Sequence, residues 1–134
     1  MVLDETMIVA GLGCRKGASA DQITAAIASA LAGADRKPMA LDIIAAPVAK
    51  GDEPGIAAAA CALGVPLVLV PQSDLEAASP RTRTRSERAI AVMGVPSVAE
   101  AAALAAAGPS ARLLAARIAV GPVTCALAES ENVP

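Results

Sequence analysis

An apolar run that leads directly into a glycine-rich loop is the feature that most constrains the fold of this chain. The run extends from Met7 to Ala10, and the loop continues to Gly17 with the sequence G-L-G-C-R-K-G. Ser19 follows, with Gln22 three residues later, which is the spacing of a capping box at the start of a helix. The stretch therefore predicts a buried strand, a glycine loop and a helix in direct succession.

The predicted loop is suited to binding an anion. A helix that begins just after such a loop directs free backbone N–H groups, and the positive end of its dipole, at whatever lies above the loop. Arg15 and Lys16 add two full positive charges there. We therefore expect a site for a carboxylate or a phosphate. Its candidate ligand-binding residues are Gly11, Gly13, Cys14, Arg15, Lys16 and Gly17.

Short apolar runs alternate with helical segments along the rest of the chain. Further strands are expected at 38–45, 66–70, 112–116 and 120–127. Helices are expected at 20–31, 56–63, 86–93 and 98–107, with a short one from Ser73, which has capping-box spacing to Glu76. This alternation predicts an α/β fold, a three-layer αβα domain with a mainly parallel sheet. The sheet is expected to be mixed, because the last two strands are close enough to form an antiparallel hairpin.

Length, charge and the absence of aromatic residues narrow the class of protein. At 134 residues we expect one domain over 1–134, with residues 129–134 as a tail. The net charge is −2 and no aromatic residue is present. Nothing therefore favours nucleic acid, which is attracted by positive charge and stacks its bases on aromatic side chains.

Histidine is absent, and the three cysteines (Cys14, Cys61 and Cys125) are far apart and lack C-x-x-C spacing. This excludes a Ser-His-Asp triad and argues against a zinc site, so we expect no metal and no cofactor. Scattered cysteines favour a reducing compartment. Acidic residues precede the first apolar run, and no apolar stretch is long enough to span a bilayer. We therefore expect a cytoplasmic protein without a membrane partner.

Lys50 and Glu53 are the candidate catalytic pair. They lie in the loop P-V-A-K-G-D-E-P-G, at the expected carboxyl end of a strand, where α/β folds bind their ligands. Glu53 could act as the general base on a water molecule while Lys50 holds a carboxylate. The alternative is an exposed ion pair beside a helix that Asp52 caps, and such a pair contributes little to stability.

Two later segments have both a structural and a ligand-binding explanation. Ser97 and Glu100 have the spacing of a capping box, which is the first explanation, and ligand binding is the second. The segment 79–88 is the most polar of the chain and contains four arginines. It is either a solvated loop or a lid that closes over an acidic ligand.

Cys14 lies between the glycine turn and two cations, which would favour its thiolate and make it a candidate nucleophile. The alternative is a small residue packed in a tight turn, and Cys61 and Cys125 are expected in the core. A dinucleotide site is a further alternative. The pattern G-x-G-x-x-x-G is one residue away from the usual spacing, and Asp42 could bind a ribose.

Four segments, in this order, resemble the cobalamin-biosynthesis family that includes CobE and the C-terminal domain of CbiG. They are G-L-G-C-R-K-G at 11–17, K-G-D-E-P-G-I at 50–56, G-V-P-S-V-A-E-A-A-A-L at 94–104 and V-T-C-A-L-A at 123–128. The resemblance covers nearly the whole chain. The stand-alone CobE form is the closer match, because CbiG-type proteins carry further N-terminal domains. Arg117 stands where the family more usually has a lysine.

The resemblance implies an α/β domain that acts in corrin-ring synthesis. Its expected ligand is an acidic precorrin-type or corrinoid intermediate, since early intermediates carry several acetate and propionate carboxylates. A carrier of this kind would also contact other corrin-pathway enzymes. A hydrolase of the CbiG type, which opens a precorrin lactone with loss of a two-carbon fragment, remains the alternative. The lack of histidine and of a clear acid–base pair favours the carrier.

Overall fold

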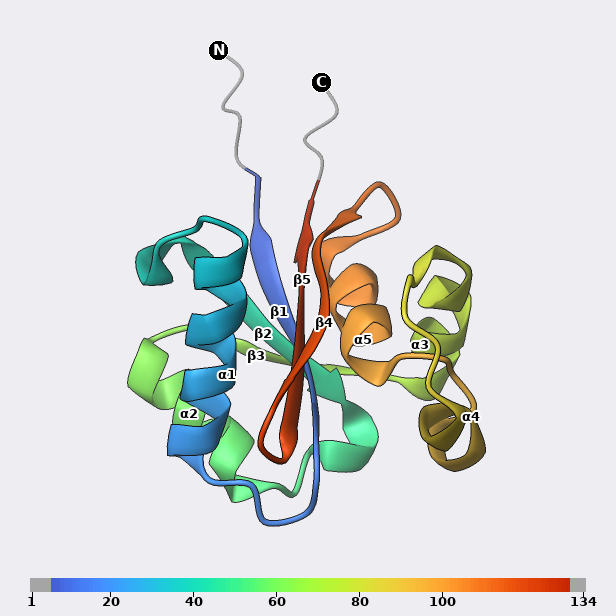
Figure 1. Ribbon diagram of the computed structural model, residues 1–134, viewed down its shortest axis with the longest axis horizontal. Helices are drawn as coiled ribbons and strands as arrows, with labels where there is room; N and C mark the ends of the chain where they lie inside the picture. The colour runs from blue at the N-terminus through green and yellow to red at the C-terminus, as the bar shows by residue number, and fades with distance from the viewer. Residues whose placement is uncertain (1–5, 131–134) are drawn as a thin grey trace.

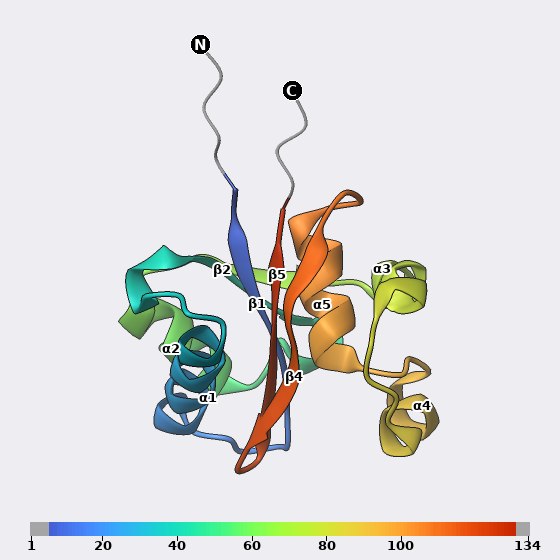
Figure 2. The ribbon, with the colours of Figure 1, turned by 45° about the horizontal axis from the view of Figure 1, so that its top comes forward.

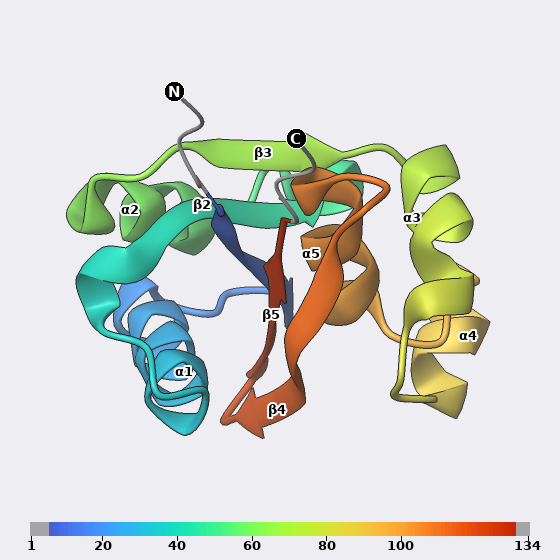
Figure 3. The same cartoon turned by 90° about the horizontal axis from the view of Figure 1, so that it is seen from above.

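The computed structural model describes residues 6–130, and in them a five-stranded sheet lies between two layers of helices (Figure 1 and Figure 3). The strands are β1 (Ile8–Cys14), β2 (Leu41–Pro47), β3 (Leu67–Val70), β4 (Arg112–Val120) and β5 (Val123–Glu129). Their order is β3-β2-β1-β5-β4. β1, β2 and β3 pair in parallel, while β5 is antiparallel to both β1 and β4. The predicted mixed sheet and final hairpin are confirmed.

The helices are α1 (Ala20–Gly33), α2 (Pro54–Leu63), α3 (Gln72–Ala78), α4 (Glu87–Met93) and α5 (Val98–Ala107). α1 and α2 cover one face of the sheet, and α3, α4 and α5 lie on the other (Figure 3). This arrangement is the expected three-layer αβα domain. Short 3-10 turns precede β2, follow it and follow α3.

The first helix forms as its sequence predicts. The Ser19 hydroxyl accepts the Gln22 N–H at 3.1 Å, and the Gln22 side chain accepts the Ser19 N–H at 2.9 Å, which completes the capping box. The buried residues of α1 recur at helical spacing and pack on the sheet; they are Ile23, Ala26, Ile27, Ala30 and Leu31.

The last helix packs unusually close to the sheet. α5 is rich in alanine, and its small side chains let its backbone approach β1 where β1 has Gly11. A Cβ atom at Gly11 would lie 2.0 Å from the Ala99 carbonyl oxygen and 2.6 Å from the Ala103 nitrogen. Without aromatic side chains to fill space, the core of this chain depends on Leu, Ile and Val and on this close contact.

Several local predictions were wrong. β2 begins at Leu41, because residues 38–40 form a 3-10 turn. β3 is an edge strand rather than a buried one, and Val68 is 36% exposed. The residue before α2 is Glu53, not Asp52, and it makes no capping bond from its side chain. α3 starts after Pro71 without a capping bond from Ser73.

The C-terminal tail begins later than expected. Glu129 is the last residue of β5, and its carboxylate lies 3.7 Å from the Arg36 guanidinium and 3.2 Å from that of Arg112. Ser130 exchanges hydrogen bonds with Met7, at 2.8 and 2.9 Å. The rest of the predicted tail, 131–134, lies outside the described residues.

The structure separates the two cysteines that were expected in the core. Cys61 is exposed on α2, so its predicted place in the core is wrong, whereas Cys125 is buried as expected.

In residues 6–130, no single helix is both long and apolar enough to cross a membrane. Only α4 and α5 taken together pass that test, and they are bent by 66° at the break between them.

Candidate functional site

Three loops meet at one edge of the sheet. The loop after β1 and the loop after β2 leave the carboxyl ends of parallel strands, and the β4–β5 turn lies beside the loop after β1 (Figure 2). The Arg15 N–H donates to the Pro122 carbonyl at 3.0 Å. The Gly17 N–H donates to a Glu53 carboxylate oxygen at 2.9 Å. These two bonds join the glycine loop to the hairpin turn and to the Lys50–Glu53 loop.

A cavity of about 670 Å³ opens at this edge, between the loops, α4 and the start of α5. That volume is in the range of small-molecule sites. Five cationic side chains line it: Arg15, Lys16, Lys50, Arg88 and Arg117. The rest of the wall is mainly aliphatic, with Val92, Met93, Val98, Ala119 and Pro122. Among the described residues, none of those lining it is Asp or Glu.

The structure divides the predicted glycine-loop residues into two groups. Gly13, Cys14, Arg15 and Lys16 line the cavity. Gly11 lies beneath α5 instead, and Gly17 turns the chain with φ +84°, a conformation that favours glycine.

The backbone amides of the loop are used differently from what we expected. Those of Arg15, Gly17 and Ala18 donate within the protein, to Pro122, Glu53 and Arg15 respectively. These three groups are therefore not free to hold a ligand. Positive charge at this site comes from side chains.

Cys14 faces the cavity but is not activated by it. Burial raises the pKa of the Cys14 thiol, and Glu53 raises it further, while Lys50 acts in the opposite direction without overcoming burial. The expectation that nearby cations favour the thiolate is therefore wrong. At neutral pH Cys14 is a neutral thiol in the wall.

The two candidate catalytic residues, Lys50 and Glu53, have different surroundings. Lys50 lines the cavity, whereas Glu53 is not among its lining residues. In residues 6–130 no ion pair joins the two side chains. The Glu53 carboxylate holds the glycine loop through Gly17. A catalytic role for this pair stays a prediction.

Ser97 and Glu100 are the only fully buried polar residues in the described part of the chain. The Ser97 hydroxyl accepts the Glu100 N–H at 3.3 Å, so half of the predicted capping box is present. The Glu100 carboxylate does not return to Ser97. It accepts the backbone N–H groups of Arg83 at 2.6 Å, Thr84 at 2.9 Å and Arg117 at 2.8 Å, and also the Thr84 hydroxyl.

This set of bonds fixes the ionisation of Glu100. Burial acts to raise the pKa of its carboxyl, but hydrogen bonds from Thr84, Arg117 and Arg83 outweigh burial and hold the pKa below its ordinary value. The carboxylate is therefore charged at neutral pH. It does not line the cavity, yet it binds the backbone of Arg117 where the pairing of β4 with β5 is irregular. Glu100 thereby supports one of the cavity cations.

The segment 79–88 is less free than a solvated loop. The Arg81 guanidinium donates to the carbonyls of Gly108 at 3.2 Å and Ala111 at 3.0 Å. Glu100 holds the backbone of Arg83 and Thr84. Of its arginines only Arg88 lines the cavity, from α4.

Arg117 was not predicted as a site residue, and Arg88 was considered only as part of the segment 79–88 that could form a lid. A helical wheel or strand alternation gives the face on which each side chain lies, but not which face borders a ligand. For Arg117 one signal was available: it is a cation where the family also has one.

Ser97 provides a direct test of the structural explanation of this pair. Replacing Ser97 with alanine removes the acceptor for the Glu100 N–H, so we expect a loss of about 1 kcal/mol in the free energy of unfolding. Affinity for any ligand of the cavity should not change, because Ser97 does not line it. Urea unfolding followed by circular dichroism measures the first quantity. A large loss of affinity at unchanged stability would instead place Ser97 in the site.

The position of Asp42 removes the basis for a dinucleotide site. Asp42 is the second residue of β2, at the amino end of the strand, and its carboxylate accepts the Ile8 N–H at 2.9 Å. A ribose-binding acid would be needed at the opposite, carboxyl end, where the glycine loop lies.

The fold and the cavity define an α/β protein with a cation-lined cavity at the carboxyl edge of its sheet. The chain belongs to the family described as cobalamin synthesis G C-terminus, whose model matches residues 8–128. It is a cobalamin-biosynthesis protein of the CobE and CbiG C-terminal type, as the sequence motifs indicated.

Known relatives are similar to this chain in sequence and structure over most of its length. A protein CobE from Sinorhizobium sp is 38% identical over 121 residues, which is 90% of this chain and 79% of that protein. The crystal structure of CobE, a protein from the cobalamin biosynthetic pathway, has a TM-score of 0.92 at 34% identity and covers 100% of this chain and 98% of that one.

The cobalamin biosynthesis protein chiG from Agrobacterium tumefaciens is 45% identical, with a TM-score of 0.76 and coverage of 94% of this chain and 100% of that one. A putative cobalamin biosynthesis protein G homolog from Sulfolobus solfataricus is 26% identical, with a TM-score of 0.73. It matches 93% of this chain but only 37% of its own length.

Proposed function

We propose that the cavity binds an acidic precorrin-type or corrinoid intermediate and that the protein holds it without changing it. The observation that supports this most is the lining itself, which within residues 6–130 has five cations, no carboxylate and a mainly aliphatic remainder. Several carboxylates around an apolar macrocycle complement such a wall. Arg15, Arg88 and Arg117 can each hold a carboxylate through two parallel N–H bonds, while lysines provide point charges.

The aliphatic part of the wall suits the body of the ligand. Val92, Val98 and Ala119 can cover the face of a macrocycle without the aromatic stacking that this chain cannot provide. A carrier also has to release its ligand, so we propose that other corrin-pathway enzymes are its partners. Membership of the cobalamin-biosynthesis family supports both proposals.

Removing single cavity cations should weaken binding strongly. We expect Arg15→Ala and Arg117→Ala each to lose about 1.5–3 kcal/mol of binding free energy for a polycarboxylate corrinoid, because each removes a charge-assisted hydrogen bond. The fold should remain intact, since both residues line the cavity and, among the described residues, neither side chain makes a hydrogen bond or an ion pair. Absorbance titration measures the affinity against a protein without tryptophan or tyrosine.

Arg85→Ala is the matched control for charge. Its side chain is 69% exposed, pairs in the described part of the chain only with Glu87, at 3.1 Å, and does not line the cavity. If Arg85→Ala weakened binding as much as Arg117→Ala, the effect would come from overall charge and the proposed site would be wrong.

A hydrolase of the CbiG type is the alternative, and Glu53 decides it. A general base contributes roughly 10²–10⁴-fold to a rate. If Glu53 acts on water, Glu53→Gln should lose that factor and still bind corrinoid. We expect instead that wild type returns every offered intermediate unchanged, as judged by mass spectrometry. A product formed catalytically by wild type but not by Glu53→Gln would show that the protein is an enzyme and that the carrier proposal is wrong.

A further inference from the structure

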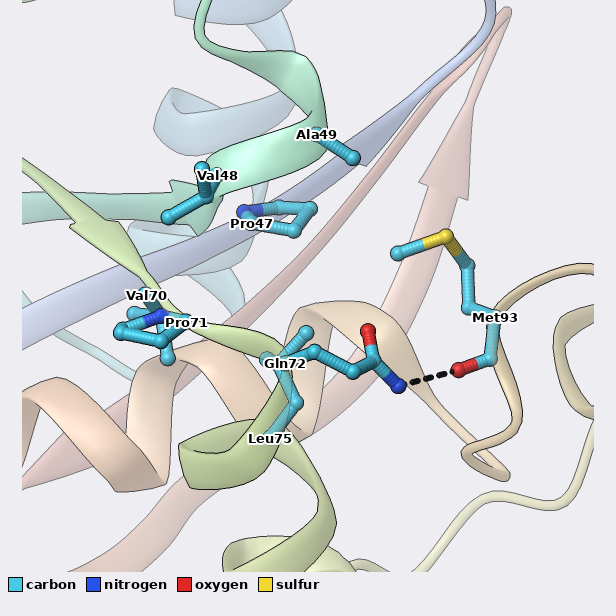
Figure 4. Close-up of a pocket in the computed structure, with 8 residues that line it drawn as sticks. All are labelled: Pro47, Val48, Ala49, Val70, Pro71, Gln72, Leu75 and Met93. Atoms are coloured by element: carbon cyan, nitrogen blue, oxygen red, sulfur yellow. Dashed lines mark hydrogen bonds between the residues drawn. The ribbon is translucent and has the colours of Figure 1, made fainter.

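A second, apolar cavity adjoins the cationic one. It has a volume of about 370 Å³ and lies between the end of β2, the end of β3 and the start of α3 (Figure 4). Pro47 and Met93 line both cavities, so the two cavities share these residues as a common wall. We call this second cavity the annex. The annex is otherwise lined by Val48, Ala49, Val70, Pro71, Gln72 and Leu75.

The annex differs from its neighbour in charge. None of its lining residues carries a charge, and Gln72 is its one side chain with a polar amide among the described residues. The NH₂ group of that amide is already used: its Nε2 donates to the Met93 carbonyl at 2.7 Å and to Glu76 at 3.1 Å. A carboxylate in the annex would lose water without gaining a cation, which is costly. An uncharged hydrocarbon group would not.

Met93 separates the two cavities. Its backbone carbonyl is held by Gln72, while its side chain extends toward the loop after β2 (Figure 4). A thioether side chain is flexible and polarizable, so it can adapt to what lies on either side. α4, which carries Met93, completely buries none of its residues.

We propose that the annex is a subsite for an uncharged, methyl-bearing position on the rim of the macrocycle whose carboxylates occupy the cationic cavity. The inference depends on the proposed function and deepens it, because it states which substitution pattern the protein prefers. A ring that carries a methyl group beside each of its acidic side chains can place a methyl group in the annex. A ring with an acidic side chain at every peripheral position can offer the annex only a charged group.

Two porphyrins supply the test, since they share a macrocycle and four propionates. Coproporphyrin carries four methyl groups where uroporphyrin carries four acetates. Ala49→Leu should fill the annex from an exposed position and Val48→Asn, at a residue that is 52% exposed, should make it polar. Val68→Asn on β3 is the control, because Val68 is 36% exposed and lines neither cavity.

We expect Ala49→Leu and Val48→Asn to weaken coproporphyrin binding at least about fourfold, the value of one buried methyl group. Uroporphyrin binding should change less than about twofold in both variants, and Val68→Asn should leave both affinities at the wild-type value. Unchanged coproporphyrin affinity in the annex variants, or an equal loss for both porphyrins, would show that the annex is not a subsite. If Arg117→Ala still weakened binding in that case, the proposed function would stand. Wild type that bound neither porphyrin would overturn the proposed function and the annex together.

Discussion

Replacing Gly11 with alanine is expected to destabilise the protein by more than about 4 kcal/mol, a large part of the 5–15 kcal/mol that stabilises a typical domain. The added Cβ would lie 2.0 Å from the Ala99 carbonyl oxygen and 2.6 Å from the Ala103 nitrogen. Both are backbone atoms of α5, so no side-chain rotation can relieve the contact. α5 would have to move away from β1 and uncover its buried alanine face.

Gly33→Ala is the control for this prediction. Gly33 is the last residue of α1, and no atom lies within 4 Å of the Cβ that it would gain. Alanine is the better helix former, so the control should be neutral or stabilise by up to about 1 kcal/mol. Urea unfolding followed by circular dichroism compares the two variants. A Gly11→Ala variant as stable as wild type would show that α5 and β1 are not in close contact.

Gly11 also shows where the sequence stops being informative about the site. A glycine in a strand–loop–helix stretch is expected to serve the loop, and we placed Gly11 among the ligand-binding residues. The structure places it under a helix that lies far along the chain. A contact between distant segments depends on sheet order and helix placement. No local pattern of residues contains that information.

Local patterns did determine much of the fold. The Ser19–Gln22 capping box, the first helix, the final hairpin and the α/β alternation were all predicted from neighbouring residues and are confirmed. Predictions that needed knowledge of sheet position failed. β3 is half exposed because it lies at an edge, and Cys61 is exposed because it lies on the outer side of α2.

The cavity shows the same limit. Arg15 and Lys16 could be identified because they follow the glycine turn. Arg88 and Arg117 come from α4 and β4, and they meet the loop only in the folded chain. The family resemblance indicated an acidic ligand. The structure shows which cations line one cavity and could bind such a ligand together.

Replacing Glu100 with glutamine is expected to cost about 3–5 kcal/mol of stability. Hydrogen bonds to a charged acceptor contribute about 1.5–3 kcal/mol each, and leaving a buried donor unsatisfied costs about 1–3 kcal/mol. In its better orientation the amide oxygen would still accept from Arg83 and Thr84. Its NH₂ group would then face the Arg117 N–H, and two donors cannot pair.

Glu76→Gln is the control, because Glu76 is exposed on α3 and receives a hydrogen bond only from Gln72 among the described residues. Its stability should stay within about 0.5 kcal/mol of wild type. A Glu100→Gln variant with equally small loss would show that the buried carboxylate contributes little.

The cost of Glu100→Gln should also depend on pH. The pKa of Glu100 is lowered in the folded protein. Its contribution is therefore fully present above the pKa of an unfolded glutamate, about 4.3, and is lost as the pH falls through the folded value. We expect the difference in unfolding free energy between wild type and Glu100→Gln to be constant near neutral pH and to shrink in acid. Urea unfolding at a series of pH values measures it. If this difference in unfolding free energy stayed the same in acid, Glu100 would not be ionised in the native state.

Glu100→Gln should also weaken polycarboxylate binding, because the backbone of Arg117 loses the acceptor that holds this cation at the cavity.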